Sequence, residues 1–195
     1  MTTSTQAPAG AERTIDHSSP GTGKVRVWDP LVRVFHWTLV AAFAVAFVTE
    51  DEVMGLHIWA GYLVLGLLAV RLVWGVIGAR HARFTDFVRG PRAVLAYLKD
   101  AIAFRAPRYL GHNPAGGAMI LALILSVGLT GLTGLSLADA HGYENEALEE
   151  VHEFFAFLSL GLVLAHLAGV LFSSMAHQEN LIGAMITGDK REKAQ

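Results

Sequence analysis

The stretch EEVHEFFAFLSLGLVLAHLAGVLF, residues 149–172, is almost entirely apolar but carries two histidines, His152 and His166. At about 1.5 Å per residue, it is long enough to cross the roughly 30 Å hydrocarbon core of a bilayer as a single helix. A polar side chain inside a bilayer is costly and is a functional candidate by default. The stretch therefore predicts a transmembrane helix with two functional side chains.

Three further apolar blocks have a similar length and composition. Only 16% of the 195 residues are charged, compared with roughly a quarter in an average soluble domain. We therefore predict an all-α integral membrane protein built as a four-transmembrane-helix bundle. The four predicted spans are Leu31–Val48, Leu56–Ile77, Ala115–Ala138 and Val151–Met175.

The polar segments predict the orientation of the bundle. The connections after the first and third spans are acidic, whereas the connection at residues 79–114 is rich in arginine. Because basic loops stay in the cytoplasm, this connection and both termini are expected there, in a bacterial inner membrane. Residues 1–24 are predicted to be a disordered tail, residues 25–176 the membrane domain and residues 177–195 a cytoplasmic tail.

Within the long connection, the segment FTDFVRGPRAVLAYLKDAIAFR (84–105) has apolar residues at helical spacing beside basic ones. This pattern is compatible with an amphipathic helix on the inner membrane surface. It is equally compatible with an ordinary cytoplasmic helix.

Four histidines lie in or at the ends of the apolar blocks: His36, His57, His152 and His166. With the predicted orientation, the helical rise places His36 and His166 near the inner side. His57 and His152 fall near the outer side. A separation of fourteen residues returns a helix almost to the same face, so His152 and His166 point into the bundle together. The last span would then supply one imidazole to each of two pairs.

Paired imidazoles across a helical bundle are typical of b-type haem, whose iron takes two axial ligands. The chain has no cysteine, which excludes iron–sulfur and zinc–thiolate sites. The many glycines in the spans are compatible with room for a flat macrocycle, or simply with close helix packing. We predict two haem b groups, bound by His36 with His166 and by His57 with His152.

Five further polar residues near the inner level are candidates for contacts to a bound group. Arg33 and Arg71 would each reach a haem propionate. Alternatively, Arg33 would be an ordinary cytoplasmic anchor, and Arg71 would extend its side chain to the membrane interface. The other three precede the third span and would meet a propionate or a quinone head group, or Asn113 would simply cap that helix. The five are Arg33, Arg71, Arg108, His112 and Asn113.

Five segments in order resemble the prokaryotic cytochrome b561 family, which includes the cytochrome b subunits of nickel–iron hydrogenases. The family's four haem ligands match the four histidines above, and its pairing agrees with the depth assignment. Val151 stands where the family often has leucine, which alters no ligand. The segments are VRVWDPLVRVFHW (25–37), LHIWAGYLVLGLLAVRLVWGVIG (56–78), GHNPAGG (111–117), VHEFFAFLSLGLVLAHLAG (151–169) and ENLIGAMITGDKR (179–191).

This resemblance implies a transmembrane di-haem cytochrome b of the respiratory chain. It would pass electrons between the quinone pool and a redox partner, either a hydrogenase or a c-type cytochrome. A superoxide:quinone oxidoreductase is an alternative within the family, and a haem-free transporter or scaffold is an alternative outside it. The acidic loops are compatible with docking a basic partner or with solvation alone. No nucleic-acid partner is expected, and the sequence is compatible with a homodimer.

Overall fold

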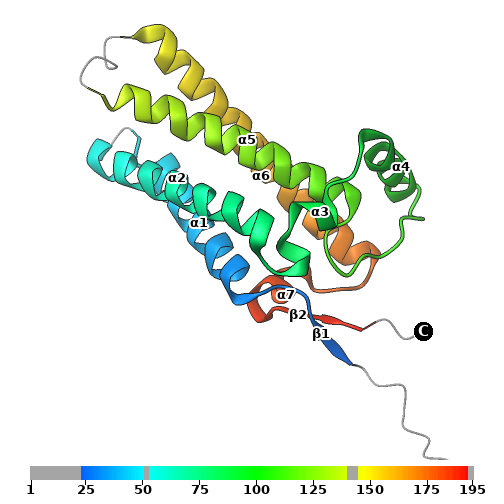
Figure 1. Ribbon diagram of the computed structural model, residues 1–195. Helices are drawn as coiled ribbons and strands as arrows, with labels where there is room; N and C mark the ends of the chain where they lie inside the picture. The colour runs from blue at the N-terminus through cyan, green and yellow to red at the C-terminus, as the bar shows by residue number, and fades with distance from the viewer. Residues whose placement is uncertain (1–22, 51–52, 140–144, 193–195) are drawn as a thin grey trace, which may run out of the picture.

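A computed structural model of the chain describes residues 23–50, 53–139 and 145–192. Four long helices dominate it and run along one another as a bundle (Figure 1). Each helix is long and apolar enough to cross a membrane, which confirms the four predicted spans. The helices are α1 (Pro30–Val48), α2 (Met54–Ile77), α5 (Pro114–Leu137) and α6 (Glu146–Ala176).

The interior of the bundle is small, and its outer surface is apolar. Ala42, Val64, Leu68 and Val127 form a buried cluster between α1, α2 and α5. Many large apolar side chains point outward instead, for example Leu125, which is 65% exposed. Such a surface would be unfavourable in water but suits contact with lipid tails, so the four helices make the chain a membrane protein.

The two ends of the bundle differ in character. The basic end holds the starts of α1 and α5 and the ends of α2 and α6, together with the arginine-rich connection. The acidic end holds the other four helix termini. The two acidic connections, residues 49–53 and 138–145, lie partly outside the described residues.

Asparagine and aspartate side chains set the helix starts at the basic end. Asp29 accepts a hydrogen bond from the backbone N–H of Val32 at 3.0 Å, and Pro30 occupies the first position of α1. Asn113 accepts from the N–H of Gly116 at 2.7 Å and so caps α5. These caps satisfy N–H groups that would otherwise lack partners inside the helix.

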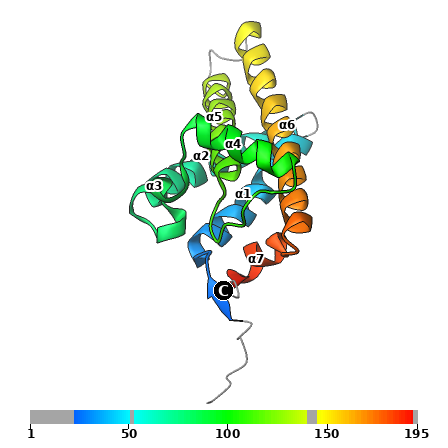
Figure 2. The same cartoon turned by 90° about the vertical axis from the view of Figure 1, so that its right-hand side faces the viewer.

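The connection between α2 and α5 folds into short helices. A 3-10 turn, η1 (Arg80–Ala82), and the single-turn helix α3 (Phe84–Phe87) lead to α4 (Pro91–Ile102). In Figure 2, α4 runs across the direction of α5 and α6 rather than along it. The segment for which the sequence left two interpretations, residues 84–105, thus forms the short helix α3 and the separate helix α4 at the basic end.

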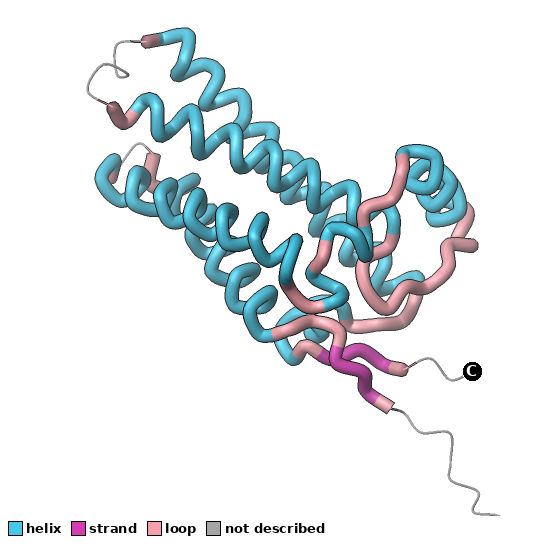
Figure 3. The backbone as a smooth tube through the Cα atoms, in the orientation of Figure 1, coloured by secondary structure: helices cyan, strands magenta, loops and turns pink. Residues whose placement is uncertain are grey.

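The chain returns to the basic end after α6. There, α7 (Leu181–Thr187) is followed by strand β2 (Asp189–Arg191), which pairs antiparallel with β1 (Lys24–Arg26). Figure 3 shows both strands together beside the start of α1. Lys24 and all of α7 and β2 belong to segments predicted as tails, whereas in the structure they fold onto the bundle. The rest of the predicted N-terminal tail, residues 1–22, lies outside the described residues.

A small apolar core and one glycine join α7 to the start of α1. Val27 and Trp28 are buried against Ala184. Gly188 ends α7 with φ of +92°, and a Cβ atom there would lie 2.8 Å from the carbonyl oxygen of Trp28. Glycine is therefore required at this position for both its backbone conformation and its close approach.

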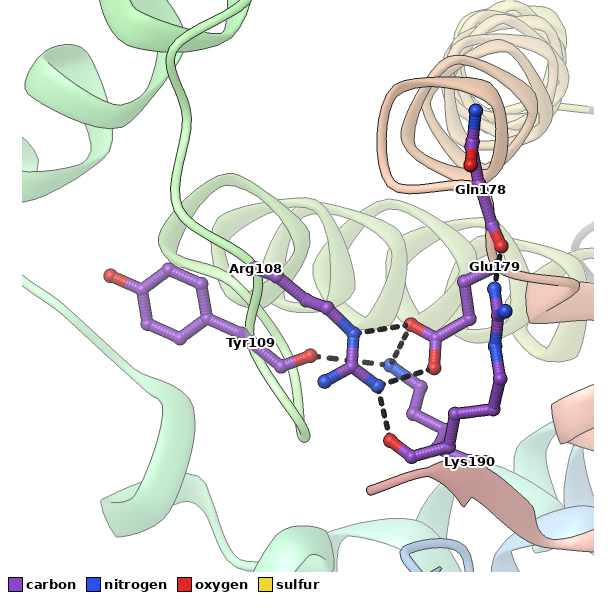
Figure 4. A network of polar contacts seen from close by, with 6 residues as sticks. Arg108, Tyr109, Gln178, Glu179 and Lys190 are labelled. Carbon is purple, nitrogen blue, oxygen red and sulfur yellow. Dashed lines mark hydrogen bonds and ion pairs between the residues drawn. The ribbon is translucent and has the colours of Figure 1, made fainter. Parts of the chain in front are cut away.

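Charged side chains complete the closure of the basic end (Figure 4). Arg108 donates to the two carboxylate oxygens of Glu179 at 3.2 and 2.6 Å, and Lys190 Nζ lies 3.8 Å from the same carboxylate. We call these three residues the basic-end clamp. Burial raises the pKa of Glu179, but the hydrogen bonds from Arg108 and the charge of Lys190 lower it further, so the net pKa lies below its usual value. Glu179 is therefore a buried carboxylate that stays ionised.

Candidate functional site

The structure brings the four histidines of the spans together as two pairs. At the acidic end, the ring centres of His57 on α2 and His152 on α6 lie 6.1 Å apart. At the basic end, the ring centres of His36 on α1 and His166 on α6 lie 6.5 Å apart. Helix α6 thus contributes one imidazole to each pair, and the pairs lie about 21 Å apart along its axis.

The ring separations fit one metal ion between the two members of each pair. An imidazole nitrogen lies about 2 Å from a metal that it binds, so two imidazoles on opposite sides of one ion have ring centres roughly 6 Å apart. Among the described residues, no group of three or more His, Cys, Asp or Glu side chains is placed to hold a metal ion. Haem supplies the other ligands of its iron from the macrocycle, so two imidazoles are the contribution that a protein makes to a bis-histidine haem site.

Backbone carbonyls orient both rings of the acidic-end pair. His57 Nδ1 lies 2.8 Å from the carbonyl oxygen of Ala46, and His152 Nδ1 lies 2.9 Å from that of Thr130. Because a carbonyl oxygen only accepts hydrogen bonds, each Nδ1 carries the proton and donates it. A neutral imidazole with its proton on Nδ1 leaves Nε2 free to bind a metal.

A cavity lies against the acidic-end pair. It is partly open to the outside, and both His57 and His152 line it. Gly61 also lines it, and a Cβ atom on Gly61 would meet nothing within 4 Å. Gly134 lies against His152, where a Cβ atom would come within 2.9 Å of Cε1 of the ring. These glycines leave space beside the pair, which suits a flat ligand.

The basic end contains three buried nitrogen atoms that have no hydrogen-bond partner among the described residues. They are Nε of Arg33, Nη1 of Arg71 and Nδ1 of His112. Buried polar groups in proteins are nearly always paired, so an orphaned group calls for an explanation. All three belong to residues that the sequence analysis proposed as contacts to a bound group, and an anionic acceptor at this end would satisfy the two arginines.

Arg71 is the most deeply buried of the three, with 4% of its surface exposed. Its guanidinium lies over the ring of Phe84 at 4.9 Å and faces Phe87 at 5.9 Å. These rings stabilise the cation but cannot accept the N–H bonds as an anion would. Of the two interpretations of Arg71 from sequence, extension to the solvated interface is the less compatible with this burial.

His112 is enclosed by aromatic rings. Its ring centre lies 4.6 Å from that of Trp28 and 4.8 Å from that of Phe87. Burial lowers the pKa of His112 to about 3, with further lowering from nearby groups that include Arg71 and Lys190. His112 is therefore neutral at physiological pH and is able to donate or accept one hydrogen bond at Nδ1.

Two other residues proposed from sequence have protein partners. Arg108 belongs to the basic-end clamp, and Asn113 caps α5. Of the interpretations that the sequence left open for Asn113, the structure shows helix capping. Arg33 is intermediate, because its Nη1 donates to the carbonyl oxygen of Ile186 at 2.5 Å while its Nε has no partner in the described chain.

Sequence reasoning missed a line of hydroxyl groups between the two histidine pairs. Ser159, which is fully buried, lies on α6 midway between His152 and His166. Its Oγ lies 2.8 Å from Oγ of Ser126 and 3.3 Å from Oγ1 of Thr130 on α5. The available signal was the spacing, since Ser159 is seven residues from each histidine and so shares their helix face.

Comparison with known proteins gives one family and one relative. The profile of the prokaryotic cytochrome b561 family matches residues 27–188. A protein of Bradyrhizobium diazoefficiens named probable Ni/Fe-hydrogenase B-type cytochrome subunit is 23% identical over 230 aligned positions, which cover 95% of this chain and 91% of that protein. No solved structure matches the chain significantly.

Proposed function

Since this chain belongs to the prokaryotic cytochrome b561 family, we propose that it is a di-haem cytochrome b that conducts electrons through the membrane between a quinone and a second redox partner. Its role as a membrane cytochrome b in electron transfer follows from the family together with the four apolar helices. The number of haem groups, their ligands, the quinone and the partner belong to the proposal.

The observation that carries the proposal is the near-equal separation of the two histidine pairs, 6.1 and 6.5 Å between ring centres. One pair would be compatible with an ordinary hydrogen-bonded contact. Two pairs with the same spacing, on one shared helix and at opposite ends of the bundle, support two equivalent bis-imidazole sites. This arrangement also argues against a haem-free transporter or scaffold.

Haem b would supply an iron that takes up and releases one electron without making or breaking bonds in the protein. The contribution of this chain is to fix the geometry. His36, His57, His152 and His166 would be the axial ligands, and the carbonyls of Ala46 and Thr130 hold two of these rings in the metal-binding tautomer. Such contacts behind the ligand also increase its basicity.

The orphaned nitrogens of the basic end fit the carboxylates that haem carries. We propose that Arg71 and Arg33 hold the propionates of the haem between His36 and His166. Arg108 and Asn113 are left out of this set because they have protein partners. His112 would contact the same propionates or a quinone head group nearby.

Orientation and partner are proposed from charge and from the relative. The basic connection and both chain ends are placed in the cytoplasm of a bacterial inner membrane, because basic segments stay on that side. The relative's name places a cytochrome of this type in a nickel–iron hydrogenase. We propose a hydrogenase subunit or a c-type cytochrome as the partner at the acidic end.

The experiment that tests this function is a haem count on the purified protein. A pyridine haemochrome assay is expected to give two haem b per chain, and dithionite is expected to produce a b-type α-band. A quinol analogue should reduce both haems, whereas reduction by superoxide alone would favour the superoxide:quinone oxidoreductase. A haem-free preparation from haem-replete cells would contradict the proposal.

A further inference from the structure

Helix α4 has an apolar face that the rest of the described protein does not cover. Leu95 is 67% exposed, Leu98 is 42% exposed and Ile102 is 79% exposed. At about 100° per residue, these three side chains fall within roughly 60° of one another around the helix. They form one continuous stripe, which we call the α4 apolar face.

The rotation of α4 about its own axis is fixed by an aromatic contact on another side. Tyr97 is 8% exposed, and its ring centre lies 5.8 Å from that of Tyr109. Tyr97 points roughly 130° away from the middle of the α4 apolar face. The helix therefore packs on the protein through Tyr97 and turns its most apolar side outward.

Basic side chains border this face on one side. Arg92 and Lys99 are exposed and lie roughly 40° to 60° beyond Leu95 around the helix. Ala96 and Asp100 lie further round, on the side that faces away from the apolar stripe. An apolar stripe bordered by bases, with a small or acidic opposite side, is the pattern of a helix that lies in the surface of an anionic bilayer.

Helix α4 lies close to the end of a candidate membrane helix. Just after α4, the ring of Phe104 lies 5.5 Å from that of Phe172, which belongs to the last turns of the membrane helix α6. Figure 2 shows α4 running across the direction of α5 and α6, and hence along the plane of a membrane that these helices cross. Phe104 is itself 78% exposed, so the apolar surface continues from α6 to α4.

We propose that α4 is a lipid-binding interfacial helix. Leu95, Leu98 and Ile102 enter the acyl-chain region, and Arg92 and Lys99 bind the phosphates of anionic lipid head groups. Lipid is favoured over a protein partner because the four spanning helices already require a bilayer around the bundle, and the apolar surface of α6 continues through Phe104 to α4. This inference concerns anchoring and does not depend on haem content.

The absence of native cysteine makes a direct test feasible. Leu95→Cys and Ala96→Cys would each carry a spin label in the full chain, reconstituted in nanodiscs that contain phosphatidylglycerol. We expect the Leu95→Cys label to be relaxed several-fold more by oxygen, which partitions into lipid, than by an aqueous nickel chelate. The adjacent Ala96→Cys label should show the opposite preference.

Each other outcome contradicts the proposal. Two labels that are equally accessible to the nickel chelate would show that α4 lies in water. A Leu95→Cys label shielded from both reagents would show that a second copy of the chain or another protein covers the face.

The head-group contact is tested with two variants of equal charge change. Lys99→Gln and Ala96→Glu each lower the net charge of the helix by one unit, the first by removing a positive charge and the second by adding a negative one on a different side of the helix. Replacing phosphatidylcholine by phosphatidylglycerol should move the Leu95→Cys label deeper into the bilayer. The Lys99→Gln variant should lose most of this change in depth, whereas Ala96→Glu should keep it. An equal loss in both variants, or no shift in the parent, would overturn the specific contact with anionic lipid.

Discussion

Gly134 on α5 lies directly against the imidazole of His152 on α6, so that a Cβ atom on the glycine would approach Cε1 of the ring to 2.9 Å. A methyl group at this position forces the ring or the helix to move. We therefore expect Gly134→Ala to displace His152 and to reduce the haem count from two per chain toward one. A pyridine haemochrome assay measures this loss.

The matched control is Gly128→Ala on the same helix. A Cβ atom there would lie 3.9 Å from Leu68 Cδ1, which is ordinary van der Waals contact. Haem content in Gly128→Ala should equal that of the parent. Equal losses in the two variants would mean that helix packing in general, rather than the His152 ring, is responsible.

The shared helix α6 makes the two proposed sites separable. His152→Ala removes a ligand from the acidic-end pair and His166→Ala one from the basic-end pair. Each variant is expected to keep about one haem, because loss of a metal ligand acts first on its own site. Redox titration should then give a single midpoint potential in each variant, and the two potentials should differ.

A control for this pair is His177→Ala, a histidine just after α6 and outside both pairs. It should retain both haems and both midpoint potentials. If His152→Ala and His166→Ala left the same remaining potential, the assignment of one α6 histidine to each site would be wrong.

The buried guanidinium of Arg71 predicts an effect on the haem midpoint potential rather than on the haem content. A positive charge beside a haem favours the reduced, more negative state, so its removal should lower the midpoint. For Arg71→Gln we expect one of the two midpoints to fall by about 60 mV, which corresponds to a tenfold change for one electron. Arg105→Gln, which alters an exposed arginine of the connection, should change neither potential.

The basic-end clamp predicts a large loss of stability from a small change. Glu179→Gln leaves the charges of Arg108 and Lys190 without their buried partner, and breaking such a pair costs about 3 kcal/mol. The reduced thermal stability should be accompanied by faster proteolysis within residues 181–191. Asp189→Asn, which removes the more exposed ion pair with Arg26, should cost less than about 1 kcal/mol.

The same carboxylate predicts how the closure depends on pH. The folded pKa of Glu179 lies below its ordinary value of 4.5, because its hydrogen bonds from Arg108 and the charge of Lys190 outweigh burial. Its contribution is therefore complete above about pH 4.5 and is lost as the pH falls through the folded pKa. Proteolysis of residues 181–191 by an acid-active protease should accelerate over that range in the parent but not in Glu179→Gln.

The membrane spans and the pairing of the histidines could be predicted from sequence, because both depend on the regular geometry of a helix. A block of about twenty apolar residues defines a membrane helix, and a fixed rise per residue assigns depth to His152 and His166. Glu146 shows the limit of this reasoning: α6 begins five residues before the predicted span, since its first turn is polar but capped by Asn145.

The closure of the basic end was not accessible in the same way. Strands of three residues have no detectable periodicity, and the contact between Arg108 and Glu179 joins positions 71 residues apart. From the sequence, a haem propionate and a carboxylate of the protein were equally good partners for Arg108. A single acidic residue just after the last membrane helix was the only local sign of Glu179's role.

The pairing of β1 with β2 also sets an order of events during synthesis. Val25 leaves the ribosome before any membrane helix, but its partner Lys190 is made only after all four. Until then β1 stays unpaired, and the basic end, where His36 meets His166, is open while the bundle inserts. A chain that stops short of residue 189 contains all four membrane helices but lacks the strand that pairs with β1.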